Sequence, residues 1–273
     1  MTDNKSNKTL PADTLLAADE PAPFRVLNPD STSSLLLVCD HASRRIPAAL
    51  GVMGLDPPAL RCHLAWDIGA GALTEHLAKR LNVTAVLCNY SRLVVDCNRQ
   101  LLDPQAFLEY SDGVIVYGNR GLSEEQKETR AREIFWPYHE AVAGQISRLQ
   151  KLDATPAILA IHSFTPVFNG VFRPWEIGIL WDKDADVPDI LIPALREAGF
   201  NVGDNEPYSG RAPQDYTLDH HAEAAGLQHA GVEVRQDLIA HSDGVLKMAD
   251  AFEKVLKTMP EALGRKGSAA LLA

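Results

Sequence analysis

The feature that most constrains the fold is an alternation of short apolar runs with longer amphipathic segments. Residues 35–39, 84–88 and 157–161 are runs of five made almost wholly of Leu, Ile, Val, Ala and Cys. Runs of this length and composition are typical of strands that are buried on both faces. Amphipathic helical segments separate them, and strands that alternate with helices form a largely parallel sheet. The pattern predicts an α/β fold, a three-layer α/β/α sandwich around a mixed, largely parallel sheet.

The sequence predicts one catalytic domain. A chain of 273 residues exceeds the commonest domain size but lies within the range of single α/β domains. Residues 1–24 mix Asp, Lys, Asn and Pro and lack the apolar centre of a signal peptide, which predicts a loosely attached leader. Residues 25–260 are expected to form the catalytic domain, and the small-residue-rich residues 261–273 a frayed tail.

The composition excludes several classes of partner. The net charge of −10 argues against nucleic acid, because phosphate binding needs a basic face. No apolar run reaches the roughly 18 residues that a membrane span needs. The four cysteines form no C-x-x-C pair, which favours reduced thiols in a cytoplasmic protein. We therefore expect a cytoplasmic protein that acts on a small acidic molecule, and the sequence leaves its oligomeric state open.

Three further elements bear on the site. Apolar residues recur at helical spacing over residues 59–82, but Gly69 interrupts them and predicts a break at residues 66–69. Ser123 is expected to cap a long helix that kinks at Pro137. Residues 93–95 form a short apolar run that predicts another strand.

Polar side chains end the predicted strands. They are Asp40 and His41 after residues 35–39, residues 96–99 after the run 93–95, His162 after residues 157–161, and Glu233 within the later run 231–234. Ligands of open α/β sheets bind at the carboxyl ends of the strands. These groups are therefore expected to meet at one edge of the sheet.

Two histidines from separate strands favour a metal site of zinc type. Zinc prefers imidazole nitrogen, with a carboxylate as third ligand and an open position for water. His41 and His162 are the expected histidine ligands, and Asp67 is the candidate for the third, because the glycine-rich break would expose its side chain. The alternative role of Asp67 is to cap a helix that begins at Ile68. Asp40 is a second candidate ligand, although it should point away from His41 on a strand.

Glu233 is the candidate general base. It lies between two valines on a predicted strand, so it faces opposite to them. A buried carboxylate needs a partner or a function. The partner would be Arg235, two residues further on the same face; the function would be to take a proton from the attacking water.

The short run from Arg92 to Arg99 is rich in groups that bind carboxylates. Arg92, Asn98 and Arg99 are candidate substrate-binding residues, because guanidinium groups bind carboxylates through two parallel hydrogen bonds. The alternative is internal pairing, Arg92 with Asp96 and Arg99 with a surface acid.

The remaining histidines are interpreted as structural. His220 and His221 are adjacent and would point about 100° apart on a helix, so capping or surface roles are favoured over a shared metal. His63, His76 and His139 fall in stretches that read as helical.

Taken together and in this order, five motifs resemble the N-formylglutamate amidohydrolases. They are residues 40–47 (DHASRRIP), 65–69 (AWDIG), 91–99 (SRLVVDCNR), 161–165 (IHSFT) and 233–237 (EVRQD). Residues 203–211 (GDNEPYSGR) resemble the branch of that family found in many proteobacteria. The resemblance spans residues 35–256.

The resemblance implies a fold similar to the zinc carboxypeptidases and one divalent metal ion, Zn²⁺. His41 and His162 would be ligands, and Glu233 would serve as base and acid. The H-x-x-E ligand pair of the carboxypeptidases is missing because position 44 is Arg44, so the assignment of Asp67 as third ligand remains an inference.

The reaction implied is hydrolysis of N-formyl-L-glutamate to formate and L-glutamate, the last step of one histidine-degradation route. Arg92, Arg99 and Arg235 would suit a dicarboxylate, with Asn98 beside Arg99 at one carboxylate, and Tyr208 is expected to hydrogen-bond the substrate. The alternatives are a deacylase for another N-acyl amino acid, and a non-catalytic protein that binds an acidic metabolite.

Overall fold

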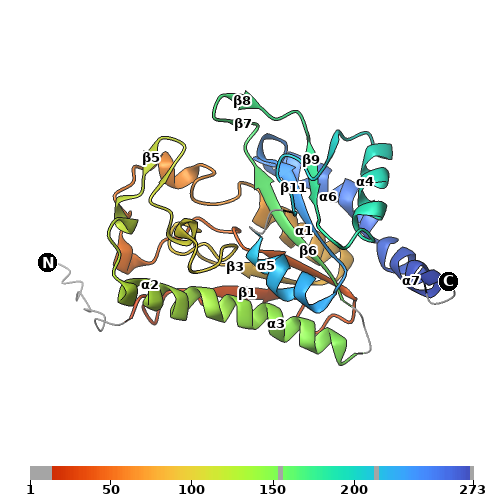
Figure 1. The fold of residues 1–273 in the computed structure, drawn as a ribbon, viewed down its shortest axis with the longest axis horizontal. Coiled ribbons are helices and arrows are strands. Elements are labelled where there is room, and N and C mark those ends of the chain that lie inside the picture. Colours follow the sequence, from red (N-terminus) through yellow and green to blue (C-terminus); the bar gives the residue numbers. More distant parts are fainter. Residues whose placement is uncertain (1–13, 153–155, 212–214, 271–273) are drawn as a thin grey trace, which may run out of the picture.

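A seven-stranded sheet runs through the centre of the molecule (Figure 1). The computed structural model describes residues 14–152, 156–211 and 215–270. The strands of this sheet are β1 (Phe24–Leu27), β2 (Leu35–Cys39), β3 (Thr84–Cys88), β6 (Ala157–Phe164), β9 (Ile177–Leu180), β10 (Val202–Asp204) and β11 (His229–Arg235). Their order in space is β1-β3-β2-β6-β11-β9-β10. The four strands from β3 to β11 are parallel, and β1 and β9 pair antiparallel with their inner neighbours. The predicted mixed, largely parallel sheet is confirmed.

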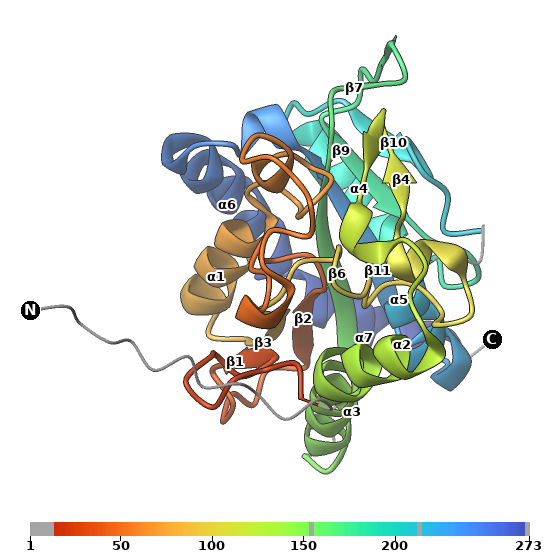
Figure 2. The ribbon, with the colours of Figure 1, turned by 90° about the vertical axis from the view of Figure 1, so that its left-hand side faces the viewer.

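Helices cover both faces of this sheet. They are α1 (Ala70–Leu81), α2 (Glu124–Arg130), α3 (Trp136–Gln150), α4 (Pro188–Glu197), α5 (Tyr216–His221), α6 (Ser242–Leu256) and α7 (Met259–Ala270). Two hairpins stand apart from the sheet: β4 (Tyr110–Ser111) with β5 (Val114–Ile115), and β7 (Val167–Phe168) with β8 (Val171–Phe172). Figure 2 shows α1 and α6 on one side of the sheet and α3 and α5 on the other.

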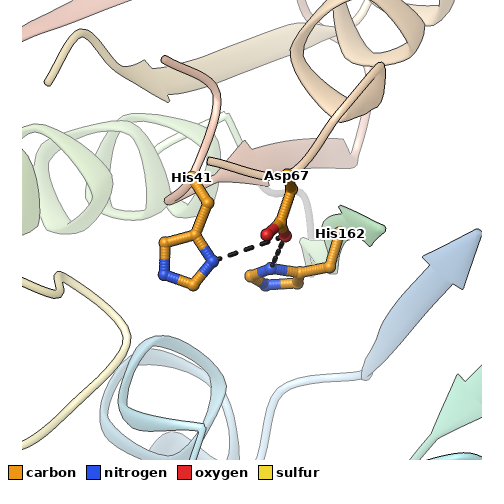
Figure 3. A group of neighbouring side chains, drawn as sticks. All are labelled: His41, Asp67 and His162. Atoms are coloured by element: carbon orange, nitrogen blue, oxygen red, sulfur yellow. Dashed lines mark hydrogen bonds and ion pairs between the residues drawn. The ribbon is translucent and has the colours of Figure 1, made fainter. Parts of the chain in front are cut away.

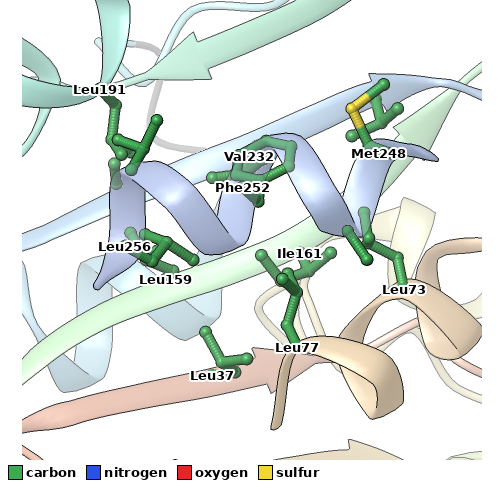
Figure 4. Packing of buried hydrophobic residues seen from close by; sticks show 14 of the residues in the cluster. Leu37, Leu73, Leu77, Leu159, Ile161, Leu191, Val232, Met248, Phe252 and Leu256 are labelled. Carbon is green, nitrogen blue, oxygen red and sulfur yellow. The ribbon is translucent and has the colours of Figure 1, made fainter. Parts of the chain in front are cut away.

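Each face of the sheet carries its own apolar core. Leu37 of β2 belongs to the core shared with α1, α4 and α6, which Figure 4 shows packing around Phe252. Leu36 and Val38 face the other core, which includes residues of α3. Because side chains alternate along a strand, β2 must be apolar at every position, and all five of its residues are buried. This explains the continuous apolar run in the sequence and confirms the three-layer fold.

The predicted strand at residues 93–95 is wrong. The segment is buried but turns instead of extending: the Val94 amide donates to the Ser91 carbonyl at 3.0 Å, and the Asp96 amide donates to the Ala106 carbonyl at 2.8 Å. The run is apolar because it packs under the site in the core that includes residues of α3. Residues 93–95 therefore resemble a strand in sequence because they are buried, although they pair with no strand of the described structure.

The predicted break at residues 66–69 lies directly before α1, but residues 59–66 form a 3₁₀ turn and further turns in place of the helix predicted there. Gly69 has φ +82°, and a Cβ there would lie 2.2 Å from the Ile239 carbonyl oxygen, so only glycine fits between residue 67 and the start of α1. Further along, α2 passes through one π-helical stretch, Ala131–Phe135, into α3, whose first turn contains Pro137. Ser123 accepts from the Gln126 amide in a capping box at the start of α2.

The packed part of the chain extends beyond the predicted domain at both ends. Leu15 is buried, and its amide and that of Leu16 donate to the Glu133 carboxylate at 2.9 and 2.8 Å. Residues 259–270 form α7, whose Met259 and Leu263 are buried in the core with α6. Residues 261–270 of the predicted frayed tail are thus helical, and Leu263 among them is buried in that core. Among the described helices, none combines the length and the apolar character needed to cross a membrane.

Candidate active site

His41, Asp67 and His162 lie together at the carboxyl ends of the parallel strands (Figure 3). His41 follows β2, His162 lies near the end of β6, and Asp67 comes from the loop before α1. Nδ1 of His162 lies 2.9 Å from Asp67 Oδ2, and Nδ1 of His41 lies 3.4 Å from the same oxygen. All three side chains are buried. The structure thus brings the three predicted ligands into one cluster.

The backbone fixes the position of Asp67. Its amide donates to the His41 carbonyl at 3.0 Å, and its Oδ2 accepts from the Ser163 amide at 3.2 Å. The loop is therefore tied to the strands that carry both histidines. Gly69, not Asp67, is the N-cap residue of α1, so the alternative capping role of Asp67 is wrong.

The outward nitrogen of each histidine faces a second aspartate. His41 Nε2 lies 2.7 Å from Asp96 Oδ1, and His162 Nε2 lies 3.3 Å from Asp40 Oδ2 without hydrogen-bond geometry. Thr217 Oγ1 donates to the other oxygen of Asp40 at 2.6 Å. In metal sites, a carboxylate behind each histidine fixes its orientation and raises its basicity. Asp40, the second candidate ligand, occupies this backing position instead of facing the cluster.

The charges of the cluster favour a bound cation. Burial and Arg92 lower the pKa of His41, but Asp96 and Asp67 outweigh them and raise it above 6.5. Burial also lowers the pKa of His162, but its contacts with Asp40 and Asp67 raise it to well above 6.5. Both shifts show a field that attracts positive charge, which protons or a metal ion could supply.

The donor set fits a divalent ion of zinc type. The three residues offer two imidazole nitrogens and one carboxylate oxygen, all within 4.8 Å of one another. Three protein ligands of this kind, leaving one position open, are typical of catalytic zinc. His41, His162 and Asp67 are therefore the residues that would hold a metal.

Glu233 lies beside the cluster. It is opposite His162 in the register between β11 and β6. Its side chain is buried, and Oε2 has no hydrogen-bond partner among the described residues. Burial raises the pKa of Glu233 to about 7, against the opposing charge of His162. Arg235, its expected alternative partner, instead donates to Asp237 from Nε at 2.8 Å.

A cavity of about 460 Å³ opens onto these groups. Its wall includes the three candidate ligands and Glu233. It also includes four of the candidate substrate-binding residues, which are Arg92, Asn98, Arg99 and Tyr208, and Ser163. A cavity of this size can enclose a small organic ligand, since such sites measure on the order of 300–1,000 Å³. A larger cavity of about 820 Å³ lies near the amino ends of β6 and β11 and contains none of the candidate ligands.

The candidate substrate-binding residues differ in how they are held. Arg92 donates to Asp96 from Nε at 3.1 Å and from Nη2 at 2.7 Å, which is the internal pairing raised as the alternative. Asn98 Oδ1 accepts from the Thr217 amide at 3.0 Å. Arg99 lines the cavity and donates to the Asn98 carbonyl at 2.8 Å. Arg235 is absent from the described lining of the cavity, because Asp237 holds it elsewhere.

Sequence reasoning did not single out Phe168 and several other residues of the cavity wall, and it misplaced His63. His63 lines it from a turn, not from the helix expected there. Phe168 lines it from the hairpin of β7 and β8, and Arg173 lies directly behind Phe168 and Tyr208. The pair Asn169-Gly170, which lies between two Val-Phe pairs and has positive φ at both residues, is a sequence signal for the hairpin, but it does not mark Phe168 or Arg173 as residues of the site. His221 is buried against His139, so its expected capping or surface role is also wrong.

Comparison with known proteins places the chain in a family. The model of the N-formylglutamate amidohydrolase family matches residues 33–240. The chain belongs to the N-formylglutamate amidohydrolase family. It is accordingly a hydrolase of the amidohydrolase type, and the matched residues include every candidate site residue.

Two solved structures share the fold of this chain. A gene product from Agrobacterium tumefaciens is 34% identical, with 93% of this chain and 99% of that chain covered and a TM-score of 0.87. An N-formylglutamate amidohydrolase from Ralstonia eutropha JMP134 is 20% identical, with 90% and 100% covered and a TM-score of 0.71, a likeness that shows the fold alone. No curated protein matches this amidohydrolase significantly.

Proposed function

We propose that this protein is a cytoplasmic, metal-dependent amidohydrolase that cleaves N-formyl-L-glutamate to formate and L-glutamate, as a step of histidine degradation. The observation that carries the proposal is the buried cluster of His41, Asp67 and His162, with Glu233 on the next strand, whose Oε2 accepts no hydrogen bond from any described residue. Both open onto one cavity. Family membership supports the amide substrate.

The metal, for which Zn²⁺ is the proposed ion, would be held by His41, Asp67 and His162. When bound, such an ion lowers the pKa of water towards about 7 and polarises a carbonyl group. Asp96 and Asp40 lie behind the two imidazoles, 2.7 and 3.3 Å from their Nε2 atoms, while the Nδ1 atoms face Asp67.

Glu233 would move the protons. Its buried carboxylate takes a proton from the attacking water and returns it to the amine that leaves when the C–N bond of the formamide breaks. Both steps need an oxygen with no other partner, which Glu233 Oε2 provides.

The substrate would be held by groups on the cavity wall. Arg99 and Asn98 are proposed to bind the α-carboxylate, and Tyr208 to donate a hydrogen bond. Arg92 is proposed to act on the aspartates instead, since Asp96 and Asp67 lie within 2.7 and 3.6 Å of its guanidinium nitrogens.

The test is formate release from purified protein of measured metal content. N-formyl-L-glutamate, N-formyl-L-aspartate and N-acetyl-L-glutamate form the panel, with acetate measured for the last. We expect the first to be hydrolysed fastest, with activity lost on chelation and restored by Zn²⁺. Preference for the acetyl compound would favour a deacylase for another N-acyl amino acid, and an inactive protein without metal would favour the binding-protein alternative.

A further inference from the structure

Arg173 is a buried cation for which the described residues supply no acidic partner. The residue follows β8 directly and is 9% exposed. No carboxylate of the described residues lies within ion-pair distance of its guanidinium. Its Nη1 donates to the Tyr208 hydroxyl at 2.8 Å and lies 3.5 Å from the Thr165 carbonyl oxygen. Aromatic rings surround it: the guanidinium carbon is 4.7 Å from the ring centre of Phe168 and 4.8 Å from that of Tyr208.

Other buried arginines of the protein are neutralised or saturated. Arg92 is paired with Asp96. Arg130, also without an acid, donates to the oxygens of Val94, Asn119 and Gly118 at 2.6–3.0 Å. Burying a cation without a counter-charge is costly, and aromatic faces offset only part of that cost. A charge kept in this position therefore points to an anion that is not part of the chain.

The position of Arg173 relates it to the candidate active site. Phe164, whose ring centre lies 5.9 Å from the guanidinium carbon, is two residues beyond His162 on β6 and so points to the same face of the sheet. Phe168 and Tyr208, whose rings lie next to the guanidinium, both line the cavity. Arg173 and Tyr208 flank the β9–β10 side of the sheet, whereas Asn98 and Arg99 follow β3 on the other side of β6.

The hydrogen bond with Arg173 orients the Tyr208 hydroxyl. Arg173 can only donate, so the Tyr208 oxygen accepts and the hydroxyl proton must point elsewhere. The Tyr208 side chain borders the cavity and is partly exposed there. The pair thus presents a hydrogen-bond donor, backed by a positive charge, towards the cavity.

We propose that Arg173 and Tyr208 form a second anion subsite, which binds a carboxylate of the substrate at the end of the cavity opposite Arg99. With the proposed function, on which the identity of the substrate rests, this group is the side-chain carboxylate of the N-acyl amino acid. The substrate class is then an N-acyl dicarboxylic amino acid, with one carboxylate on each side of the metal ligands.

The test compares N-formyl-L-glutamate with N-formyl-L-glutamine, which differ only in the side-chain carboxylate. In the wild type we expect kcat/KM to favour the diacid by at least about 10²-fold, because the amide leaves the subsite charge unpaired. Arg173→Met should bring this ratio close to one, mainly through a higher KM for the diacid. Arg173→Lys should retain part of the ratio, and Tyr208→Phe should reduce it. Arg211→Met is the matched control, since Arg211 is exposed, stacks on Trp181 and is not a lining residue of the cavity.

The outcomes separate this subsite from other roles. Equal losses on both substrates in Arg173→Met would overturn the proposal, since a structural role or a role at the reacting carbonyl affects both alike. An unchanged ratio would overturn it too.

A binding measurement tests the subsite even if the protein does not catalyse the proposed reaction. If the metal-loaded wild type hydrolyses neither compound, calorimetry with glutarate and with its monoamide tests the subsite alone. Binding of glutarate by the wild type but not by Arg173→Met supports the subsite even though the proposed function has failed. Absence of glutarate binding to the wild type, or equal binding to both proteins, overturns it.

Discussion

A buried pair of histidines beneath the active site should make this amidohydrolase unstable in mild acid. His139 of α3 and His221 of α5 are 3% and 8% exposed. His139 Nε2 lies 2.9 Å from the Cys97 carbonyl oxygen, which only accepts, so Nε2 must carry the proton. His139 Nδ1 then accepts from His221 Nε2 at 3.0 Å. The pair is therefore held as two neutral rings, and it ties both helices to the loop that carries Asn98.

The size of the effect follows from the pKa values. Burial lowers the pKa of His139 from 6.5 to about 4, and burial and His139 lower that of His221 to about 3. A lowered pKa means that the unfolded chain binds the proton first, so each group's stabilisation is complete above pH 6.5 and is lost as the pH falls towards the folded pKa. At pH 5 this amounts to about 2 kcal/mol for each histidine, relative to pH 7.5.

The measurement is urea unfolding of wild type and His139→Gln at pH 7.5, 6 and 5. Buried aspartates contribute to the pH dependence of both proteins, so only the difference between them counts. We expect the variant to be less stable at pH 7.5 but to lose about 2 kcal/mol less between pH 7.5 and pH 5. His241→Gln, at an exposed histidine, is the control and should keep the wild-type slope. Parallel pH profiles for wild type and His139→Gln would refute the reasoning.

Four further predictions concern the candidate site. His41→Ala and His162→Ala should each lose most of the bound metal while remaining folded; full zinc content in both variants, by elemental analysis, would contradict the assignment. Glu233→Gln should keep the metal and lower kcat by on the order of 10²–10⁴, and near-normal turnover would make Glu233 structural. Asp96→Asn should weaken metal affinity by about 10–100-fold, measured by competition with a chelator, because it removes the carboxylate behind His41; unchanged affinity would count against that role. Arg99→Lys should lower kcat/KM for N-formyl-L-glutamate more than for its α-amide, since an ammonium cannot form the bidentate pair, and equal losses would show that Arg99 does not bind the α-carboxylate.

The sequence predicts best those strands whose residues are all buried. β2, β3 and β6 lie between two cores and must be apolar throughout, so their sequences differ visibly from those of helices. The edge strands β1 and β10 are short and only partly buried, and they leave no such pattern. The segment 93–95 shows the converse, since a buried turn can be as apolar as a strand.

The sequence predicts those residues of the candidate site that lie at the ends of buried strands. His41 and His162 follow or end buried strands, and parallel strands bring such ends together. Asp67 could be predicted because the glycine beside it interrupts a helical pattern. The partners behind the histidines were harder to predict, because Asp40 and Asp96 carry no mark that separates a ligand from a residue that orients one. Arg173 could not be predicted as a site residue, because the chain returns to the end of β6 only through the hairpin of β7 and β8, which stands beyond that end (Figure 1), and there the Arg173 amide donates to the Pro166 carbonyl at 2.8 Å.

The arrangement of charge gives the four arginines near the site different roles. Arg92 is tied to Asp96 and Asp67, so its charge offsets the aspartates that surround the two histidines. Arg235 is tied to Asp237 outside the described lining of the cavity. Because a guanidinium that is already paired with a buried carboxylate gains little from a second one, neither is suited to bind the substrate. Arg99 borders the cavity on the β3 side, and Arg173 on the β9 side is buried with no acidic partner among the described residues. A substrate with two carboxylates is therefore the one that best complements the charges of this site.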